Sequence, residues 1–432
     1  MDEDILIVGA GIFGVSTAYH LALTVSNPSR ITLLDRAVAP STLAASTDIN
    51  KVIRADYSNP LYMELGFEAI DAWKSLPFFQ NAGVYHRSGW IAMGEKDRDT
   101  PARIRQNFHD RDRDASIVDM TEEEVRRKWG GVLRRTNCTP FGSYYFNASA
   151  GWVDAGRALQ ILAQEAIKLG VKYQTAEVRR ILLGNGRVQG VETETGGVYK
   201  TDKVLLATGA WTSQLMSPVE DELGLSDVER VESQVSATGV SVAHFQLSEA
   251  EKVTYAQLPV LVYGGQGEVI PPTASGVLKF TFTTSFKNTM ETPSGHSISV
   301  PSVQDQMDVP EKLQEDSIMG IRARLPQILE NNRRPDYYRL CWDAISSDQH
   351  PRITQHPDHR LANLYLAVGG SFHCYKFLPT IGKYVTNVLR GVGNGQKDEA
   401  WRWRKSRCHE RGVHETLVPK KELRDFASGS VQ

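Results

Sequence analysis

The chain begins with an apolar run that leads directly into three closely spaced glycines. Ile5–Val8 is followed by Gly9, Gly11 and Gly14, and residues 15–23 are mostly small or apolar with helical periodicity. Strand, tight turn and helix in this order are the context that a dinucleotide fingerprint requires. Gly9 permits the turn, Gly11 lets the backbone approach a pyrophosphate, and Gly14 lets the helix pack closely on the strand. The N-terminus therefore predicts a nucleotide-binding α/β unit whose first helix faces the negative charge.

Two later segments belong to the same predicted sheet. Residues 30–35 form a largely apolar strand that ends in Asp35, an acid suited to a pair of ribose hydroxyls. Residues 201–211 contain a buried strand that ends in Ala-Thr-Gly. A strand that ends in a small-residue turn beside the first glycine turn is what a flavin dinucleotide needs where the connectivity of the sheet reverses.

Residues 228–300 have a different pattern, rich in Val, Thr, Tyr and Phe with a period of two, which is typical of an antiparallel sheet. The 432 residues are too many for one simple core. We predict an α/β fold with a discontinuous, glutathione-reductase-type Rossmann-like FAD-binding domain (1–80, 145–225 and 335–395). An antiparallel-sheet substrate domain (81–144 and 226–334) is interleaved with it. Residues 96–137 are expected to be a mostly helical, solvated covering layer, and 396–432 a charged C-terminal tail on the surface.

The composition excludes several classes of partner. Lys plus Arg number 49 against 51 for Asp plus Glu, so the formal net charge is -2. This balance gives no electrostatic case for nucleic acid or an anionic membrane, and no apolar run approaches the roughly 20 residues that cross a bilayer. Four widely spaced cysteines indicate neither a metal site nor a disulfide framework. We expect an intracellular, cytoplasmic protein, without a leader and without a peroxisomal Ser-Lys-Leu end.

Several cations stand out by their context. Lys51 and Arg54 lie three apart in a polar segment after the ribose strand, where a solvated loop is the simpler interpretation. Lys279 alternates with apolar neighbours and can therefore face a cavity, although most strand lysines point to solvent. Near the C-terminus an apolar strand runs into Gly-Gly-Ser and an aromatic turn with His373 and Lys376. The helix that follows offers a second N-terminus for anionic groups.

In order and spacing these segments resemble the monomeric sarcosine oxidase family of flavin amine oxidases, near the fructosyl amino acid oxidases (amadoriases) and the pipecolate and saccharopine oxidases. The resemblance covers residues 4 to about 390. It rests on the glycine turn, Asn50-Lys51-Val-Ile, Lys279, Cys341 and the Gly-Gly-Ser-x-His-x-x-Lys376-Phe turn. It implies FAD as cofactor, with the expected contacts Gly9, Gly11, Ile12, Phe13, Gly14, Asp35, Arg36, Ser46, Asn50, Lys51, Val178, Thr208, Gly209, Trp211, Cys341, Gly370, Phe372, His373 and Lys376.

The resemblance also implies roles for single residues. Cys341 would form a thioether to the flavin, since a thiolate can add to the ring where cations lower its pKa; the alternative is a small buried hydrophobe. Lys279 would activate dioxygen by stabilising the developing anion. Arg54 and Lys376 would bind the substrate carboxylate.

Three further residues complete the expected catalytic set: Lys51, His373 and Asp343. Asp343 lies two residues from Cys341 and so shares a strand face with it. Its carboxylate either contacts the substrate or is a satisfied structural acid.

The chain departs from the family at several positions. Thr283 stands where sarcosine oxidases carry a histidine, and Phe372 and Cys374 replace glycines of the C-terminal turn. Arg54 and His373 look like the sarcosine and pipecolate side of the family, whereas Asn50-Lys51 looks like the sugar-amine side.

We therefore predict a monomeric FAD-dependent oxidase of a secondary or N-methylated amine that bears a carboxylate. Hydride transfer to the flavin gives an imine, and dioxygen reoxidises the flavin with release of hydrogen peroxide. The imine hydrolyses or is captured by an internal nucleophile, as in a tailoring step of secondary metabolism. The alternatives are a deglycating fructosyl amino acid oxidase, a dehydrogenase that passes electrons to a protein or quinone, and a flavin-binding protein without turnover.

Overall fold

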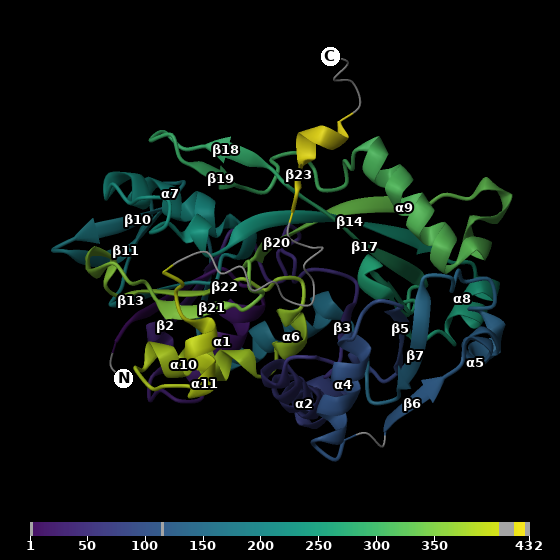
Figure 1. The fold of residues 1–432 in the computed structure, drawn as a ribbon. Helices are drawn as coiled ribbons and strands as arrows, with labels where there is room; N and C mark the ends of the chain where they lie inside the picture. Colours follow the sequence, from purple (N-terminus) through teal and green to yellow (C-terminus); the bar gives the residue numbers. More distant parts are fainter. Residues whose placement is uncertain (1–2, 114–115, 406–418, 428–432) are drawn as a thin grey trace.

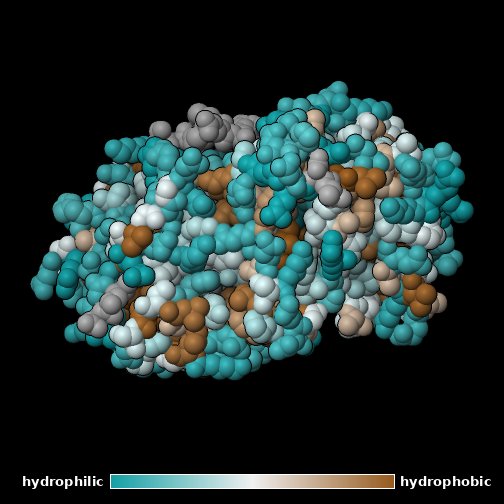
Figure 2. All heavy atoms as spheres, turned by 90° about the horizontal axis from the view of Figure 1, so that it is seen from below, coloured by the Kyte–Doolittle hydropathy of each residue, from teal (hydrophilic) through white to brown (hydrophobic). Residues whose placement is uncertain are grey.

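Two large β-sheets organise the fold (Figure 1). The computed structural model describes residues 3–113, 116–405 and 419–427. A six-stranded sheet has the order β21-β22-β13-β1-β2-β9, and a larger mixed sheet has the order β20-β14-β17-β16-β15-β5-β7-β6, with β23 beside β17. Among the described residues no helix is long and apolar enough to cross a membrane. In the view of Figure 2 the surface is largely hydrophilic, with apolar side chains in separate small patches.

The six-stranded sheet carries the glycine turn near its centre. β1 pairs in parallel with both β2 and β13, and β13 pairs in parallel with β22. The predicted return of residues 201–211 to the first sheet is confirmed. The strands are β1 (Ile5–Val8), β2 (Ile31–Asp35), β9 (Lys172–Thr175), β13 (Lys203–Leu206), β22 (Leu364–Val368) and the antiparallel edge strand β21 (Arg352–Gln355).

The glycines of the turn are required by close contacts. Gly9 has φ 102°, and a Cβ there would lie 2.5 Å from the carbonyl oxygen of Ala207. A Cβ on Gly14 would lie 1.8 Å from the carbonyl oxygen of Gly9. Because real Cβ atoms do not approach this closely, helix α1 (Ile12–Ala22) can pack against the turn only with glycine at both positions.

The larger sheet forms the second layer of the molecule. Its long strands β14 (Ser236–Gln246), β17 (Val277–Lys287) and β20 (Tyr337–Ile345) are antiparallel neighbours, with β14 between the other two. The remaining strands are β5 (Trp90–Glu95), β6 (Ile117–Met120), β7 (Phe141–Asn147), β15 (Val260–Tyr263), β16 (Glu268–Ile270) and β23 (Lys421–Glu422). The predicted boundary at residue 335 does not follow sheet membership, because β20 pairs with β14 of the substrate layer.

Helices and small sheets cover these layers. α1 packs between α6 and α10, and α9 packs against β14. The helices are α2 (Pro60–Ser75), α3 (Pro77–Ala82), α4 (Thr100–His109), α5 (Glu122–Arg127), α6 (Ala155–Lys168), α7 (Thr212–Glu222), α8 (Glu249–Tyr255), α9 (Glu311–Arg324), α10 (Ile381–Leu389) and α11 (Gln396–Trp401). The small sheets hold β3 (Lys51–Ile53), β8 (Gly151–Val153) and β4 (Tyr85–His86); β10 (Val178–Gly184), β11 (Arg187–Thr193) and β12 (Val198–Lys200); and β18 (Thr289–Glu291) with β19 (Ser297–Ser299).

Two expectations about surface segments hold only in part. Residues 96–137 contain the short helices α4 and α5, strand β6 and irregular segments, so they are less helical than expected; most of their described residues are exposed or half-buried, and apolar side chains such as Phe108 and Leu133 are buried. The first part of the tail is packed: Trp401 and Trp403 are buried, and Arg404 Nε lies 3.0 Å from Asp348 Oδ2. The high density of charged residues in these segments did not predict that their apolar side chains are buried. Cys408 and the C-terminal pentapeptide lie outside the described residues.

Candidate active site

Two adjoining cavities lie where the two sheets meet. One, of about 490 Å³, surrounds the glycine turn and the carboxyl ends of the parallel strands. The other, of about 370 Å³, lies against the inner strands of the larger sheet. Lys51, Phe372 and Tyr375 line both cavities. The two cavities therefore form one long site, with space for a nucleotide at the glycine turn and for a further ligand group against the larger sheet.

Most predicted cofactor contacts line the nucleotide cavity. They are Gly9, Gly11, Ile12, Phe13, Asp35, Arg36, Ser46, Lys51, Val178, Thr208, Gly209, Trp211, Gly370 and Phe372. Asp35 is held by the backbone N–H of Ala10, which donates to Oδ2 at 2.7 Å, and by that of Ala37, which donates to Oδ1 at 3.2 Å. These bonds fix the carboxylate at the end of β2, beside the glycine turn.

Asn50 was expected to contact the cofactor, but it lines neither cavity. Its side-chain amide is buried and donates to the carbonyl oxygen of Pro271 at 3.1 Å. Gly14 does not line the cavity either, since its role is to allow the close packing of α1 against the glycine turn.

The nucleotide cavity fits a dinucleotide with a pyrophosphate. The N-terminus of α1 has no side-chain hydrogen bond from its cap residue Gly11, and no acid in its first turn. A helix start of this kind attracts an anion through its free N–H groups and its dipole. Trp342 Nε1, on the cavity wall, is buried and has no hydrogen-bond partner among the described residues. An indole N–H in that state needs an acceptor that a ligand can supply.

A buried carboxylate joins two of the predicted lysines. Asp48 Oδ2 accepts from Lys279 Nζ at 2.7 Å and lies 3.0 Å from Lys51 Nζ. Burial favours the neutral acid, but the two ammonium groups hold the pKa of Asp48 below its ordinary value. Burial lowers the pKa of Lys279, and the attraction of Asp48 opposes that change only in part. Lys279 is fully buried and faces the second cavity, as its strand alternation predicted.

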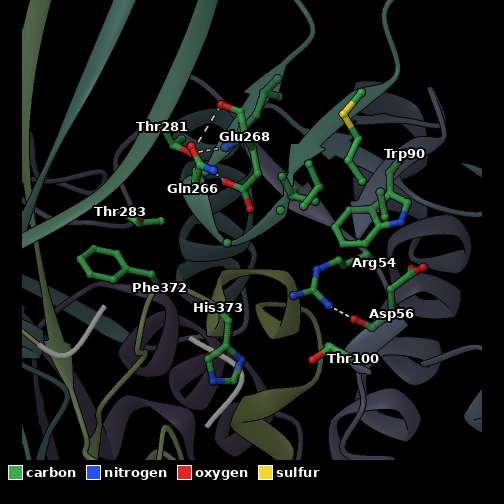
Figure 3. A pocket seen from close by; sticks show the side chains of 18 of the residues that line it. Arg54, Asp56, Trp90, Thr100, Gln266, Glu268, Thr281, Thr283, Phe372 and His373 are labelled. Atoms are coloured by element: carbon green, nitrogen blue, oxygen red, sulfur yellow. Dashed lines mark hydrogen bonds between the residues drawn. The ribbon is translucent and has the colours of Figure 1, made fainter. Parts of the chain in front are cut away.

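The second pair of predicted cations meets at one tyrosine ring. The guanidinium carbon of Arg54 lies 4.3 Å from the centroid of Tyr57 and 4.9 Å from that of Trp90. Arg54 also donates to the backbone carbonyl of Asp56 (Figure 3). Lys376 Nζ donates to the hydroxyl of Tyr57 at 2.9 Å. Tyr57 therefore places both cations on one wall of the second cavity.

Tyr57 also contacts His373, another residue of the predicted catalytic set. His373 Nδ1 lies 3.1 Å from the Tyr57 hydroxyl, and the backbone carbonyl of His373 accepts from Lys376 Nζ. Burial, reinforced by the nearby charge of Arg54, lowers the pKa of Lys376 well below its ordinary value. A bound carboxylate would oppose both effects, so the anion and this ammonium stabilise each other.

The turn that follows β22 is unusual in its backbone. Ser371 and Phe372 have φ values of 47° and 57°, in the left-handed region that favours glycine. Asp343 holds this turn, since its Oδ2 accepts from the backbone N–H of Phe372 at 2.8 Å. Asp343 lines the nucleotide cavity, and the second cavity does not include it. Its contacts are those of a structural acid, the second of the two interpretations left open by the sequence. Cys341 is buried and lines the second cavity.

Sequence reasoning missed several polar residues of the second cavity, among them Asp48, Asp56, Tyr57 and Glu268. Asp56 is buried, and its carboxylate accepts from Tyr145 and from Asn147 at 3.1 and 2.9 Å. Burial raises the pKa of Asp56 to about 6. The spacing of Asp48 three residues before Lys51 was the one available signal for an ion pair. Tyr57 and Glu268 carried none, because their partners lie far away in the sequence.

The family model for FAD dependent oxidoreductases matches residues 4–388 of this chain. The chain belongs to that family. The protein is thus an FAD-dependent oxidoreductase, and both the predicted cofactor and the predicted fold class are confirmed.

Individual relatives agree with the predicted resemblance. The L-saccharopine oxidase of Schizosaccharomyces pombe is 27% identical over 426 residues, which cover 94% of each chain. The monomeric sarcosine oxidase of a Bacillus species is 22% identical, with 89% of this chain and 91% of the relative covered. A crystal structure of a thermally stable fructosyl peptide oxidase mutant matches all of both chains, with 26% identity and a TM-score of 0.85.

Proposed function

We propose that this flavoprotein oxidises a secondary or N-methylated amine that carries a carboxylate, with dioxygen as the electron acceptor. One observation carries the proposal: Arg54 and Lys376 are buried on one cavity wall, and neither has a carboxylate within ion-pair distance among the described residues. Unpaired buried cations are costly unless an anion joins them. A substrate carboxylate supplies that anion.

The chain itself would orient the substrate. Two fixed cations hold a carboxylate in one direction, so the neighbouring N–Cα bond is held as well. The Tyr57 hydroxyl occupies one of the three donors of Lys376, the His373 carbonyl takes a second, and one donor is left for the substrate. Phe372 and Tyr375, at the junction of the two cavities, exclude water from the reacting carbon.

Bound FAD supplies a two-electron acceptor that takes a hydride from the carbon beside the amine nitrogen and later passes the electrons to dioxygen. Lys279 offers a buried positive charge, held in place by Asp48, to the negative charge that dioxygen acquires on reduction. Lys51 shares the same carboxylate and lies at the junction of the cavities. This arrangement supports dioxygen over a quinone or protein acceptor.

The covalent link is a second part of the proposal. Cys341 is buried and lines the second cavity together with Lys51 and Lys279. The resemblance to the sarcosine oxidase family assigns the thioether bond to this cysteine. A monomeric state and a cytoplasmic location remain parts of the same proposal, tested by sedimentation and by imaging of a tagged chain.

The function is tested by anaerobic flavin bleaching with sarcosine, pipecolate, saccharopine and fructosyl-lysine, followed by peroxide assays in air. We expect bleaching by at least one of the first three compounds. Bleaching by none of the four would support a flavin-binding protein without turnover.

Deglycation is the second candidate. It is favoured by the structural likeness to fructosyl peptide oxidases and by Lys51. It would replace the first proposal if fructosyl-lysine alone reduced the flavin. In that case the interpretation of Arg54 as a carboxylate ligand would be wrong.

A further inference from the structure

The second cavity contains an unpaired acid as well as unpaired cations. Glu268, on β16, lines it together with Arg54 and Lys376. Figure 3 shows the Glu268 side chain entering the pocket from above in that view, with the Arg54 guanidinium to its lower right. Its Oε2 accepts one hydrogen bond, from Thr281 Oγ1 at 2.9 Å. Among the described residues no basic side chain lies within 4 Å of its carboxylate.

The other acids of this cavity are already satisfied. Asp48 binds two lysines, and Asp56 accepts from Tyr145 and Asn147. Glu95 lies 3.5 Å from Arg98 and accepts from the backbone N–H of Gly265. Glu268 is therefore the acid of this cavity that no basic side chain contacts within 4 Å among the described residues. The buried guanidinium of Arg324, which donates to the Glu268 backbone carbonyl, is attracted to its charge at longer range.

Glu268 and Lys376 line the same cavity, but no contact within 4 Å joins their charged groups among the described residues. The backbone of Glu268 is fixed, since its N–H donates to Thr281 Oγ1 at 2.8 Å and its carbonyl accepts from Arg324. The hydrogen bond from Thr281 Oγ1 to Oε2 orients the carboxylate on this wall.

A cavity lined by two fixed cations and, apart from them, by an acid without a basic side chain within 4 Å complements a dipolar ligand. We propose that Glu268 is a specificity-determining residue that binds a second, cationic group of the substrate, distal to the carboxylate that Arg54 and Lys376 hold. The inference rests on the proposed oxidation of a carboxylate-bearing amine and narrows its substrate class. The substrate is a secondary amino acid whose nitrogen substituent ends in an ammonium group. A neutral substituent would leave Glu268 unpaired once water is displaced.

The test uses two matched series of N-substituted glycines. In one series an alkyl chain of three to five carbons ends in an ammonium group, and in the other a methyl group replaces it. The measured quantity is the ratio of kcat/KM for the two members of each pair, in the holoenzyme. We expect the wild type to prefer the ammonium member of at least one pair by about 10- to 100-fold, the range for a hydrogen bond to a charged group.

Glu268→Gln should bring this preference below about threefold, since the amide keeps the shape but loses the charge. Glu95→Gln is the matched control and should keep the wild-type preference, because Arg98 and Gly265 already occupy that carboxylate. Equal rates for both series in the wild type would overturn the inference while leaving the proposed function intact. A preference that survives in Glu268→Gln would overturn it as well. If neither series reduced the flavin although sarcosine, pipecolate or saccharopine did, the inference would be overturned and the proposed function would stand. If none of these compounds reduced it, the proposed function itself would fail.

Discussion

The hydroxyl of Tyr57 is the most direct test of how the substrate carboxylate is held. Tyr57→Phe keeps the ring beneath the Arg54 guanidinium but removes the acceptor of Lys376, whose Nζ then retains only the His373 carbonyl. A hydrogen bond to a charged group is worth about 1.5–3 kcal/mol, so the loss in kcat/KM should be about 10- to 100-fold. Because the carboxylate does not react, the loss should lie in binding.

Stopped-flow measurement of anaerobic flavin reduction separates the two effects. In Tyr57→Phe the substrate concentration at half-maximal rate should rise about 10- to 100-fold, while the limiting rate of flavin reduction changes by less than threefold. Tyr62→Phe is the control, because that buried hydroxyl lies 2.7 Å from His350 Nδ1 and touches neither cation. Wild-type binding in Tyr57→Phe, or an equal loss in Tyr62→Phe, would refute the reasoning.

Three further perturbations address other parts of the site. Lys279→Met should slow flavin reoxidation on the order of 100-fold and leave anaerobic reduction unchanged, as measured by mixing reduced enzyme with dioxygen. Cys341→Ser should release all yellow colour from an acid-precipitated pellet, whereas the wild type keeps its colour; colour loss from the wild type would exclude the thioether. Asp56, with its pKa raised to about 6, binds a proton more tightly in the folded state, so its contribution to stability is present near pH 4 and is lost as the pH rises through 6. Asp56→Asn should therefore gain roughly 3 kcal/mol relative to the wild type between pH 4 and 7 in urea melts, at 1.36 kcal/mol for each pKa unit; parallel curves for the two proteins would contradict this.

Local patterns predicted the elements that depend on local physics. In residues 60–75 apolar side chains recur at spacings near four, which predicts the helix that the structure has as α2 (Pro60–Ser75). The prediction succeeds because an amphipathic helix needs only near neighbours to define its apolar face. In residues 310–330 Ile318, Ile321 and Leu325 share one helical face, which predicts a helix over the whole span; the α-helix ends at Arg324, and a 3-10 segment, Pro326–Asn332, follows. Proline at position 326 interrupts the α-helical hydrogen bonds there.

Pairings between distant strands could not be derived in the same way. β20 lies in a segment predicted to belong to the FAD-binding domain, yet it pairs with β14 of the larger sheet, because the apolar pattern of a strand does not identify its neighbour. The tail residues Trp401 and Trp403 illustrate the same limit. These two side chains are buried against segments that lie far away in the sequence.

The sequence by itself predicted that a dinucleotide is bound, since strand, glycine turn and helix follow one another within residues 5–22 and the Gly14 contact lies within that segment. It also determined, through the order of its motifs, the family to which the chain belongs. Only the tertiary structure decided which charges are neutralised inside the protein. It brings Tyr57 to Lys376 across 319 positions and Asp48 to Lys279 across 231, and it leaves the Glu268 carboxylate on the cavity wall with no basic side chain within 4 Å among the described residues. A charge buried at low dielectric is costly unless it is paired. The unpaired groups, which no local pattern reveals, therefore define what the substrate must carry.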